Sequence, residues 1–401
     1  MDFKVLKRSH LKRNIIIGVV VVAIISAVVL TFTRAKYRVT ESIPLVNGTI
    51  NYTLPDLNIV GLYIDGVEAE ELDSNKTYTL DTTQSTCTYK DGTEIENLSI
   101  SYDSETSGLS ISPYTTKGTR CTLYFEEYTE PVRDVLLANY PTVLTRNNFR
   151  TTITNTTTGT IYKSLDSTQY DDYGEVYYFA GNPTDNWVKF GEFYWRIIRI
   201  NGDGTIRLIY QGTSPSTTGS ETQIGTSIYN TRNVIFQNST IMNTLDIWYQ
   251  NNLTEVSNKI DTNVGFCNDR LIYSSNANVT YYGRYRLQII YTPSYKCTSD
   301  EYLIKSGIGL ITADEIAYAG GVYLTSNSNF YLYTGMMYWT MTPIATGSNG
   351  MGNLYANAEI TYSLSAMDAD VNRGVRPVIN LKADVTISSG NGTTSNPYII
   401  S

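Results

Sequence analysis

The sequence predicts a chain of three structured parts: an N-terminal transmembrane helix, an all-β sandwich and a C-terminal α+β domain. Three observations support this prediction. An uncharged segment follows a basic N-terminus, short alternating strands separated by turn residues fill the next part, and the remainder mixes strands with capped helices. The predicted boundaries are a cytoplasmic tail at 1–13, a transmembrane helix at 14–33, a β-sandwich stalk at 39–128, a helix and polar linker at 129–169, and an α+β head domain at 170–401.

The N-terminal segment is typical of an uncleaved membrane anchor. Residues 15–30 carry no charge, and with the next three residues they would form a helix of about 28 Å, close to the hydrocarbon thickness of a bilayer. A cleaved signal peptide is disfavoured by Arg34 in the nearby small-residue site, and a prepilin leader by the lack of an acidic residue between Asp2 and Glu41. Five basic residues precede the segment and three follow it, which predicts a single-pass cell-membrane protein with a cytoplasmic N-terminus and extracellular domains.

The four cysteines predict two local disulfide bonds in an oxidising exterior. Cys87 and Cys121 fall in the sandwich, and Cys267 and Cys297 fall in the head. No C-x-x-C pair occurs and the only histidine is His10, so zinc sites and catalytic thiols are disfavoured. Each bond would contribute about 3.5 to 4 kcal/mol by chain entropy. The alternative is four reduced, buried cysteines.

The charge of the exterior part disfavours a nucleic-acid partner. The first 38 residues hold eight of the 30 basic residues and one of the 38 acidic ones, which leaves 22 against 37, a net charge of −15. Such a surface repels phosphate backbones. The 34 tyrosines suit sugar and protein binding, although an AT-rich genome would enrich tyrosine without a functional cause.

Turn pairs and capping residues place the other elements. Asp65-Gly66 and Asp91-Gly92 predict hairpins of an antiparallel, immunoglobulin-like sandwich, expected to act as a spacer. In the head, residues 201–204 predict another hairpin, and Ser239 caps a helix. A second helix, in "TADEIAYAGG", begins with a capping box. We assign a structural role to its two capping residues, Thr312 and Glu315.

The segment "GVRPVINL" reads as a strand that carries a charge beside a proline. Pro377 cannot donate a ladder hydrogen bond, so we place it with Arg376 where the strand enters the sheet. A buried guanidinium needs a carboxylate or carbonyl partner. We therefore predict a structural role for Arg376, not a catalytic one.

Several motifs in the C-terminal part recur in the same order in a known group of proteins. These motifs are "YYFAGNPTDNWVKFGEFYWRIIRINGDGTIRLIY", "FCNDR", "GLITADEIAYAGG", "YWTMTP" and "GVRPVINLKADVTISSGNGTTSNPYII". On them the chain resembles a family of uncharacterised membrane-anchored bacterial surface proteins whose C-terminal domain, of unknown function, is similar to the C-type-lectin-like and formylglycine-generating-enzyme-like fold. The resemblance covers roughly residues 177–401. It implies that residues 344–373 display the binding surface, with these exposed candidates: Asn349, Asn353, Tyr355, Asn357, Tyr362, Asp368 and Asp370.

Enzymatic chemistry is disfavoured. A formylglycine-type oxidase needs a redox-active or metal-binding cysteine pair at its substrate groove, whereas Cys267 and Cys297 lie outside residues 344–373. A serine hydrolase needs a base, and no histidine follows His10. Carboxylates leave glycosidase chemistry open, although a helix's first turn accounts for Asp314 and Glu315. The other acidic residues considered are Asp171, Asp172 and Glu192.

No cofactor is expected, and calcium is the open alternative. Asp368, Asp370 and Asn372 alternate as oxygen ligands would, but Arg373 stands where an EF-hand loop needs glycine. The sequence thus predicts non-enzymatic recognition or adhesion at the cell surface, with the membrane and an unknown extracellular glycan or protein as partners. The alternatives are a structural envelope or pilus-like assembly component and, less favoured, a cell-wall modifying enzyme.

Overall fold

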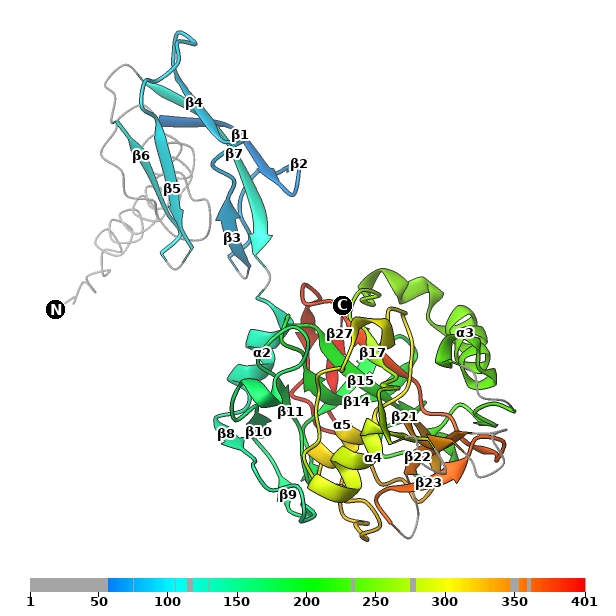
Figure 1. Ribbon diagram of the computed structural model, residues 1–401. Coiled ribbons are helices and arrows are strands. Elements are labelled where there is room, and N and C mark those ends of the chain that lie inside the picture. Colours follow the sequence, from blue (N-terminus) through cyan, green and yellow to red (C-terminus); the bar gives the residue numbers. More distant parts are fainter. Residues whose placement is uncertain are drawn as a thin grey trace, which may run out of the picture. The chain divides into compact units, whose positions relative to one another are not determined.

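The computed structural model describes residues 57–74, 76–104, 106–113, 118–128, 130–231, 235–274, 279–346, 353–358 and 362–400 (Figure 1). In these ranges the chain is mostly β-sheet. It divides into two compact units, Met1–Thr129 and Glu130–Ser401. No helix in the described ranges is long and apolar enough to cross a membrane. The predicted cytoplasmic tail and the transmembrane helix at 14–33 lie outside them.

The first unit is built from two sheets that share one core. The larger sheet has the order β2-β1-β7-β3, with β4 also on β7, and the smaller one pairs β5 with β6. Tyr102 of β5 packs edge-on against Phe125 of β7, with ring centroids 5.0 Å apart. The strands are β1 Leu57–Ile64, β2 Val67–Glu68, β3 Thr77–Leu80, β4 Thr86–Tyr89, β5 Ser99–Asp103, β6 Gly108–Ser112 and β7 Thr119–Tyr128.

One strand pair of this unit differs from the prediction of an antiparallel sandwich. β1 runs parallel to β7. The predicted hairpin between β1 and β2 is present, because Asp65 and Gly66 both adopt positive φ, 49° and 78°. The predicted Cys87–Cys121 bond is also present, and it joins residues directly opposite one another on β4 and β7.

The second unit begins earlier than the predicted head. Residues 129–169 were expected to form a helix and a polar linker. The helix is present as α2 Val132–Ala138, but the segment after it forms β8, β9 and β10, and β8 and β10 extend the main sheet. Tyr140 and Ile161 lie in the core of this unit, 2% and 0% exposed. The linker assignment was wrong because threonine, which makes this segment look polar, also favours strands.

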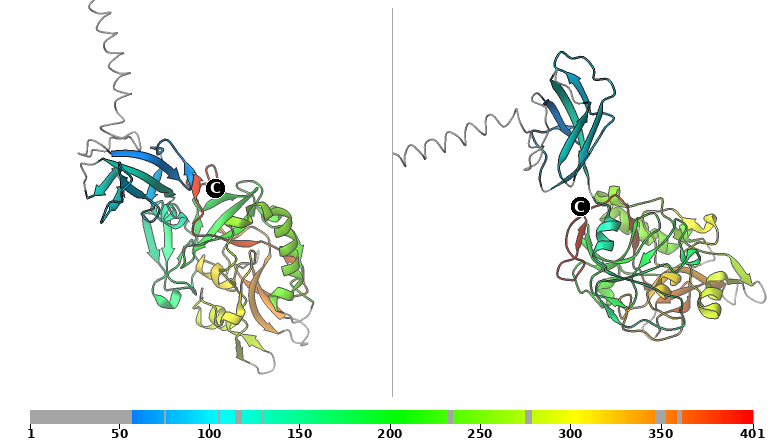
Figure 2. Two further views of the ribbon diagram at one scale, coloured as in Figure 1. Left: turned by 90° about the horizontal axis from the view of Figure 1, so that it is seen from above. Right: turned by 90° about the vertical axis from the view of Figure 1, so that its left-hand side faces the viewer.

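Two larger sheets and several helices surround one core in the second unit. The main sheet has the order β26-β27-β13-β14-β11-β10-β8, with β15 joining β14 to β25. The second sheet has the order β16-β24-β21-β19-β18, with β22 on β21 and β23 on β22. The predicted hairpin joins β14 to β15 through Gly204, whose φ is 87°. Figure 2 shows β22 and β23 (orange) side by side in both views.

The elements of the second unit follow from local signals described above. Ser239 caps α3 by accepting a hydrogen bond from the Met242 amide, and Thr312 and Glu315 form the predicted capping box of α5. The main strands are β8 Thr142–Thr145, β10 Thr160–Lys163, β11 Tyr177–Tyr178, β13 Trp187–Phe190, β14 Phe193–Ile200, β15 Ile206–Gly212, β21 Tyr338–Thr346, β22 Asn353–Ala358, β23 Ser365–Asp368 and β25 Val378–Leu381. The short strands are β9 Thr156–Thr157, β12 Asn182–Pro183, β16 Thr226–Ser227, β17 Phe266–Cys267, β18 Ile272–Ser274, β19 Thr280–Tyr281, β20 Leu303–Ile304, β24 Arg373–Gly374, β26 Ile387–Ser389 and β27 Tyr398–Ile400. The helices are α3 Thr240–Asn252, α4 Tyr282–Arg284, α5 Ala313–Tyr318 and the π-helical η5 Tyr285–Ile290; the 3-10 turns are η1 Ser167–Gln169, η2 Gly219–Thr222, η3 Phe236–Asn238, η4 Thr254–Lys259 and η6 Asp300–Tyr302.

Candidate functional site

The predicted binding segment, residues 344–373, forms the end of β21 together with β22, β23 and β24. Asn349 lies outside the described residues. The candidates Asn353, Tyr355 and Asn357 belong to β22. Tyr362, Asp368 and Asp370 are exposed.

The strand register locates Asp368 relative to its neighbour Met367. Asp368 pairs with Leu354, and Met367 pairs with Tyr355. Because neighbouring residues of a strand point to opposite faces, Asp368 and Met367 belong to different faces of the sheet. The part of the chain that the structure describes contains no group of three or more His, Cys, Asp or Glu residues arranged to hold a metal ion.

Arg376 is fully buried and is held by neutral oxygen atoms. Its Nη2 donates to the Tyr210 carbonyl at 3.0 Å and to Gln211 Oε1 at 2.7 Å, and its Nη1 donates to the Leu332 carbonyl at 3.3 Å. Burial lowers the pKa of the guanidinium. The predicted carbonyl partner is therefore present, and Pro377 directly precedes β25, as expected.

Glu315 sits at the centre of a buried set of charges that the sequence did not reveal. Its Oε2 accepts from the Thr312 amide at 2.8 Å, which completes the capping box. Its Oε1 accepts from Arg199 Nε at 3.1 Å and lies 2.8 Å from Arg207 Nε, an ion pair whose N–H direction is poor for a hydrogen bond. Arg199 also donates to Asp171 at 3.0 Å. We call Asp171, Arg199, Arg207 and Glu315 the Glu315 charge set.

The pKa values of the two arginines indicate that the Glu315 charge set has a structural role. Burial by itself lowers the pKa of Arg199, but Glu315 and Asp171 together raise it above the ordinary value. Burial lowers the pKa of Arg207 to about 10, still far above neutrality. Both arginines therefore stay charged, and each depends on the carboxylates for its stability in the core.

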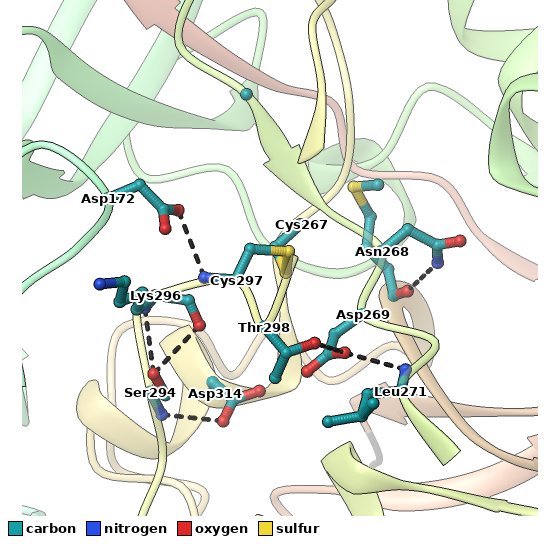
Figure 3. The surroundings of a disulfide bond; sticks show 12 residues. Asp172, Cys267, Asn268, Asp269, Leu271, Ser294, Lys296, Cys297, Thr298 and Asp314 are labelled. Carbon is teal, nitrogen blue, oxygen red and sulfur yellow. Dashed lines mark hydrogen bonds between the residues drawn. A yellow bond between two sulfur atoms is a disulfide. The ribbon is translucent and has the colours of Figure 1, made fainter. Parts of the chain in front are cut away.

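A second buried set surrounds the disulfide between Cys267 and Cys297, which is present as predicted (Figure 3). Arg286 donates to Asp269 at 2.6 Å and to both oxygens of Asp314 at 3.0 Å. The amide of Cys297 donates to Asp172 at 3.2 Å, and burial raises the pKa of that carboxyl.

The two charge sets line one crevice, and this crevice is nearly filled. Its cavity volume is about 20 Å³, which is room for about one water molecule. Asp171, Asp269, Asp314 and Glu315 are all engaged by arginines. A glycosidase needs two carboxylates that are free to act on a sugar bond, and a cleft large enough to hold the sugar between them. The engaged carboxylates and the small volume of this crevice therefore give glycosidase chemistry no support.

A partly exposed cluster of aromatic side chains lies at the edge of the second sheet. Tyr273 stacks on Tyr285 with centroids 4.4 Å apart, and Tyr282 packs beside both. Tyr273 is 45% exposed and its neighbour Ile272 is 55% exposed. We call Ile272, Tyr273, Tyr282 and Tyr285 the tyrosine surface.

The tyrosine surface borders the predicted binding segment. Ile272 and Tyr273 belong to β18, which pairs with β19, and β19 pairs with β21 through Thr280 and Ala345. The segment "YSSNANVTYYGRY" holds all three tyrosines of this surface, but only the fold shows that β18, α4 and η5 bring them into one cluster.

Comparisons with known proteins add no family to this geometry. Protein-family models, curated proteins and solved structures were each compared with the chain, and none of them matched.

Proposed function

We propose that this chain is a cell-surface protein that recognises a glycan or another protein through its second unit and performs no catalysis. The proposal keeps the predicted N-terminal anchor and extracellular orientation. The two disulfides support an oxidising exterior. A C-type-lectin-like fold for the second unit and an immunoglobulin-like one for the first belong to the same proposal.

The observation that carries this proposal is the tyrosine surface. Soluble monomers rarely leave large apolar side chains clustered in the open unless the cluster contacts a partner. Tyrosine combines a broad apolar ring with a hydroxyl and loses little conformational entropy on binding, so it suits both sugars and proteins. Its place beside residues 344–373 would join it to the segment that the family resemblance implies.

The test is a binding screen of the full-length protein in mild detergent against a glycan array and an extracellular protein fraction. We expect Tyr273→Ser to abolish retention of the ligand. The matched control is Tyr128→Ser, because Tyr128 is 47% exposed and lies in the first unit. Retention that is lost equally in both variants would contradict the proposal.

A structural assembly role is the second candidate, and one observation favours it. β18 is an edge strand of the second sheet with exposed apolar residues, which can pair with another copy of the chain. If the screen retains nothing, while the native protein forms oligomers that Tyr273→Ser dissolves, assembly replaces recognition as the function.

A further inference from the structure

The second unit has a second concave feature, which is lined by none of the residues of the two charge sets or of the tyrosine surface. Its cavity volume is about 180 Å³, against about 20 Å³ for the crevice of charges. We call it the Tyr302 groove. It is lined by Ile235, Gln237, Asn268, Arg270, Glu301, Tyr302 and Ile304.

The floor of the groove is fixed before any ligand arrives. The Asn268 amide donates to the Tyr302 carbonyl at 2.9 Å, which continues the pairing of β17 with β20. The Asn268 side chain donates to the Met341 carbonyl of β21 at 2.7 Å. Asn268 directly follows the disulfide-bonded Cys267 (Figure 3). A cross-linked floor loses little conformational entropy when a ligand binds.

The walls combine polar groups with apolar ones. The Tyr302 ring is partly exposed, and burial together with a hydrogen bond to Glu301 raises the pKa of its hydroxyl. Arg270 Nη2 lies 3.3 Å from the Tyr281 hydroxyl, to which it donates. Gln237 and Glu301 are exposed at the rim, where η3 and η6 present them.

We infer that the Tyr302 groove binds one neutral monosaccharide unit, a hexose or an N-acetylhexosamine, of a glycan. This inference rests on the proposed recognition function. A sugar ring has an apolar C–H face, which packs on an aromatic ring, and neighbouring hydroxyls, which pair with planar amide and carboxylate groups. Pockets for drug-sized ligands run from about 300 to 1,000 Å³, so the smaller groove admits a single ring.

The charges of the groove favour a neutral sugar. Arg270 and Glu301 place one positive and one negative group on the same groove, which therefore carries no net charge. A charged sugar would be attracted by one of these groups and repelled by the other, so it gains little net attraction for the loss of its hydration. A neutral sugar can use both groups, because its hydroxyls donate to the carboxylate and accept from the guanidinium.

The test uses full-length protein in mild detergent and saturation-transfer NMR with glucose, galactose, mannose, N-acetylglucosamine, N-acetylgalactosamine and glucuronic acid, each alone. We expect a neutral sugar to bind, and Gln237→Ala and Glu301→Ala each to weaken that binding by about fivefold or more. Asn238→Ala and Asp300→Asn are matched controls, because these exposed neighbours do not line the groove. The controls should bind like the native protein.

Three outcomes would overturn the inference. The first is that no neutral sugar gives saturation transfer. The second is that glucuronic acid binds more tightly than every neutral sugar, and the third is that Gln237→Ala and Glu301→Ala bind sugar as tightly as the control variants do. If any of these occurs while Tyr273→Ser still abolishes retention in the binding screen, the groove assignment fails and the recognition function stands.

Discussion

Replacing Glu315 by glutamine tests whether the buried charges hold the second unit together. Glutamine is equally able to complete a capping box, so Glu315→Gln keeps the helix cap and removes only the charge. The side chains of Arg199, Arg207 and Glu315 are 7%, 1% and 2% exposed. Two guanidiniums would therefore lose their shared partner in a crevice that has room for about one water molecule.

The expected loss is large on the scale of single substitutions. Removing one partner of a buried ion pair costs about 3 to 5 kcal/mol. At about 1.4 kcal/mol for each factor of ten, this corresponds to a change of about a hundredfold to a few thousandfold in an opening equilibrium. The pair of Lys163 and Glu175, 3.5 Å apart, provides the comparison, because its side chains are 40% and 32% exposed and pairs near the surface contribute about 0 to 1 kcal/mol.

Hydrogen exchange followed by mass spectrometry measures this loss in the full-length protein, because the slowest amides of β14 and β15 report on the second unit alone. We expect Glu315→Gln to accelerate their exchange by about a hundredfold or more and Glu175→Gln by less than about fivefold. An acceleration below about tenfold in Glu315→Gln would refute the view that these charges depend on one another.

Three further predictions use the same measurement. Burial raises the pKa of Asp185 above the value of about 3.9 in an unfolded chain, so the second unit loses stability as the pH rises from about 3.9 through the folded pKa. Asp185→Asn should therefore slow hydrogen exchange in the second unit at neutral pH, and below about pH 3.9 its exchange rates should equal those of the native protein. Slower exchange of the variant that persists at low pH would contradict this prediction. Arg376→Ala should destabilise the second unit by about 3 kcal/mol or more, because Gln211 Oε1 and the Tyr210 carbonyl each lose a buried donor, and unchanged exchange with lost ligand binding would disprove the structural role. Replacing Cys87 by alanine should speed hydrogen exchange in the first unit only. The bond joins residues 34 apart in sequence, so its loss should cost about 3.7 kcal/mol of chain entropy. Faster exchange in the second unit would contradict the view that the two units have independent cores.

Local signals predicted many elements of the fold correctly. Turn pairs such as Asp65-Gly66 need positive φ, and a capping residue such as Ser239 needs only the next turn of its own helix. Both act over a few residues, so the sequence displays them directly. The cysteine pairs were also predictable, because two local bonds were the simplest arrangement for four cysteines in two regions.

Features that depend on distant partners escaped prediction. Nothing near Asp171 in the sequence points to Arg199, and nothing near Arg199 points to Glu315, which is 116 residues away. Arginines within apolar strands were the available signal, and the same reasoning that found Arg376 applied to Arg199 and Arg207. The parallel pairing of β1 with β7 was missed for the same reason, since alternation of apolar residues does not record strand direction.

The candidate site was predicted only as a segment. The expected resemblance to lectin-like proteins led to the prediction of residues 344–373, which stays a prediction. The pairing of Asp368 with Leu354 is a further fact that no residue pattern in the sequence encodes. The tyrosine surface is formed by β18, α4 and η5, and the Tyr302 groove lies around β17 and β20. In these segments "FCNDR" is the one motif on which the family resemblance rests.

The Glu315 charge set also has a consequence for how the second unit assembles. Arg199 of β14 and Arg207 of β15 are directly opposite one another and converge on the same oxygen of Glu315 in α5. A slip of β14 by one residue would turn Arg199 to the other face and leave its cation beside apolar residues, away from Glu315. The ion pairs with α5 therefore stabilise this one register of β14 on β15 over its neighbours.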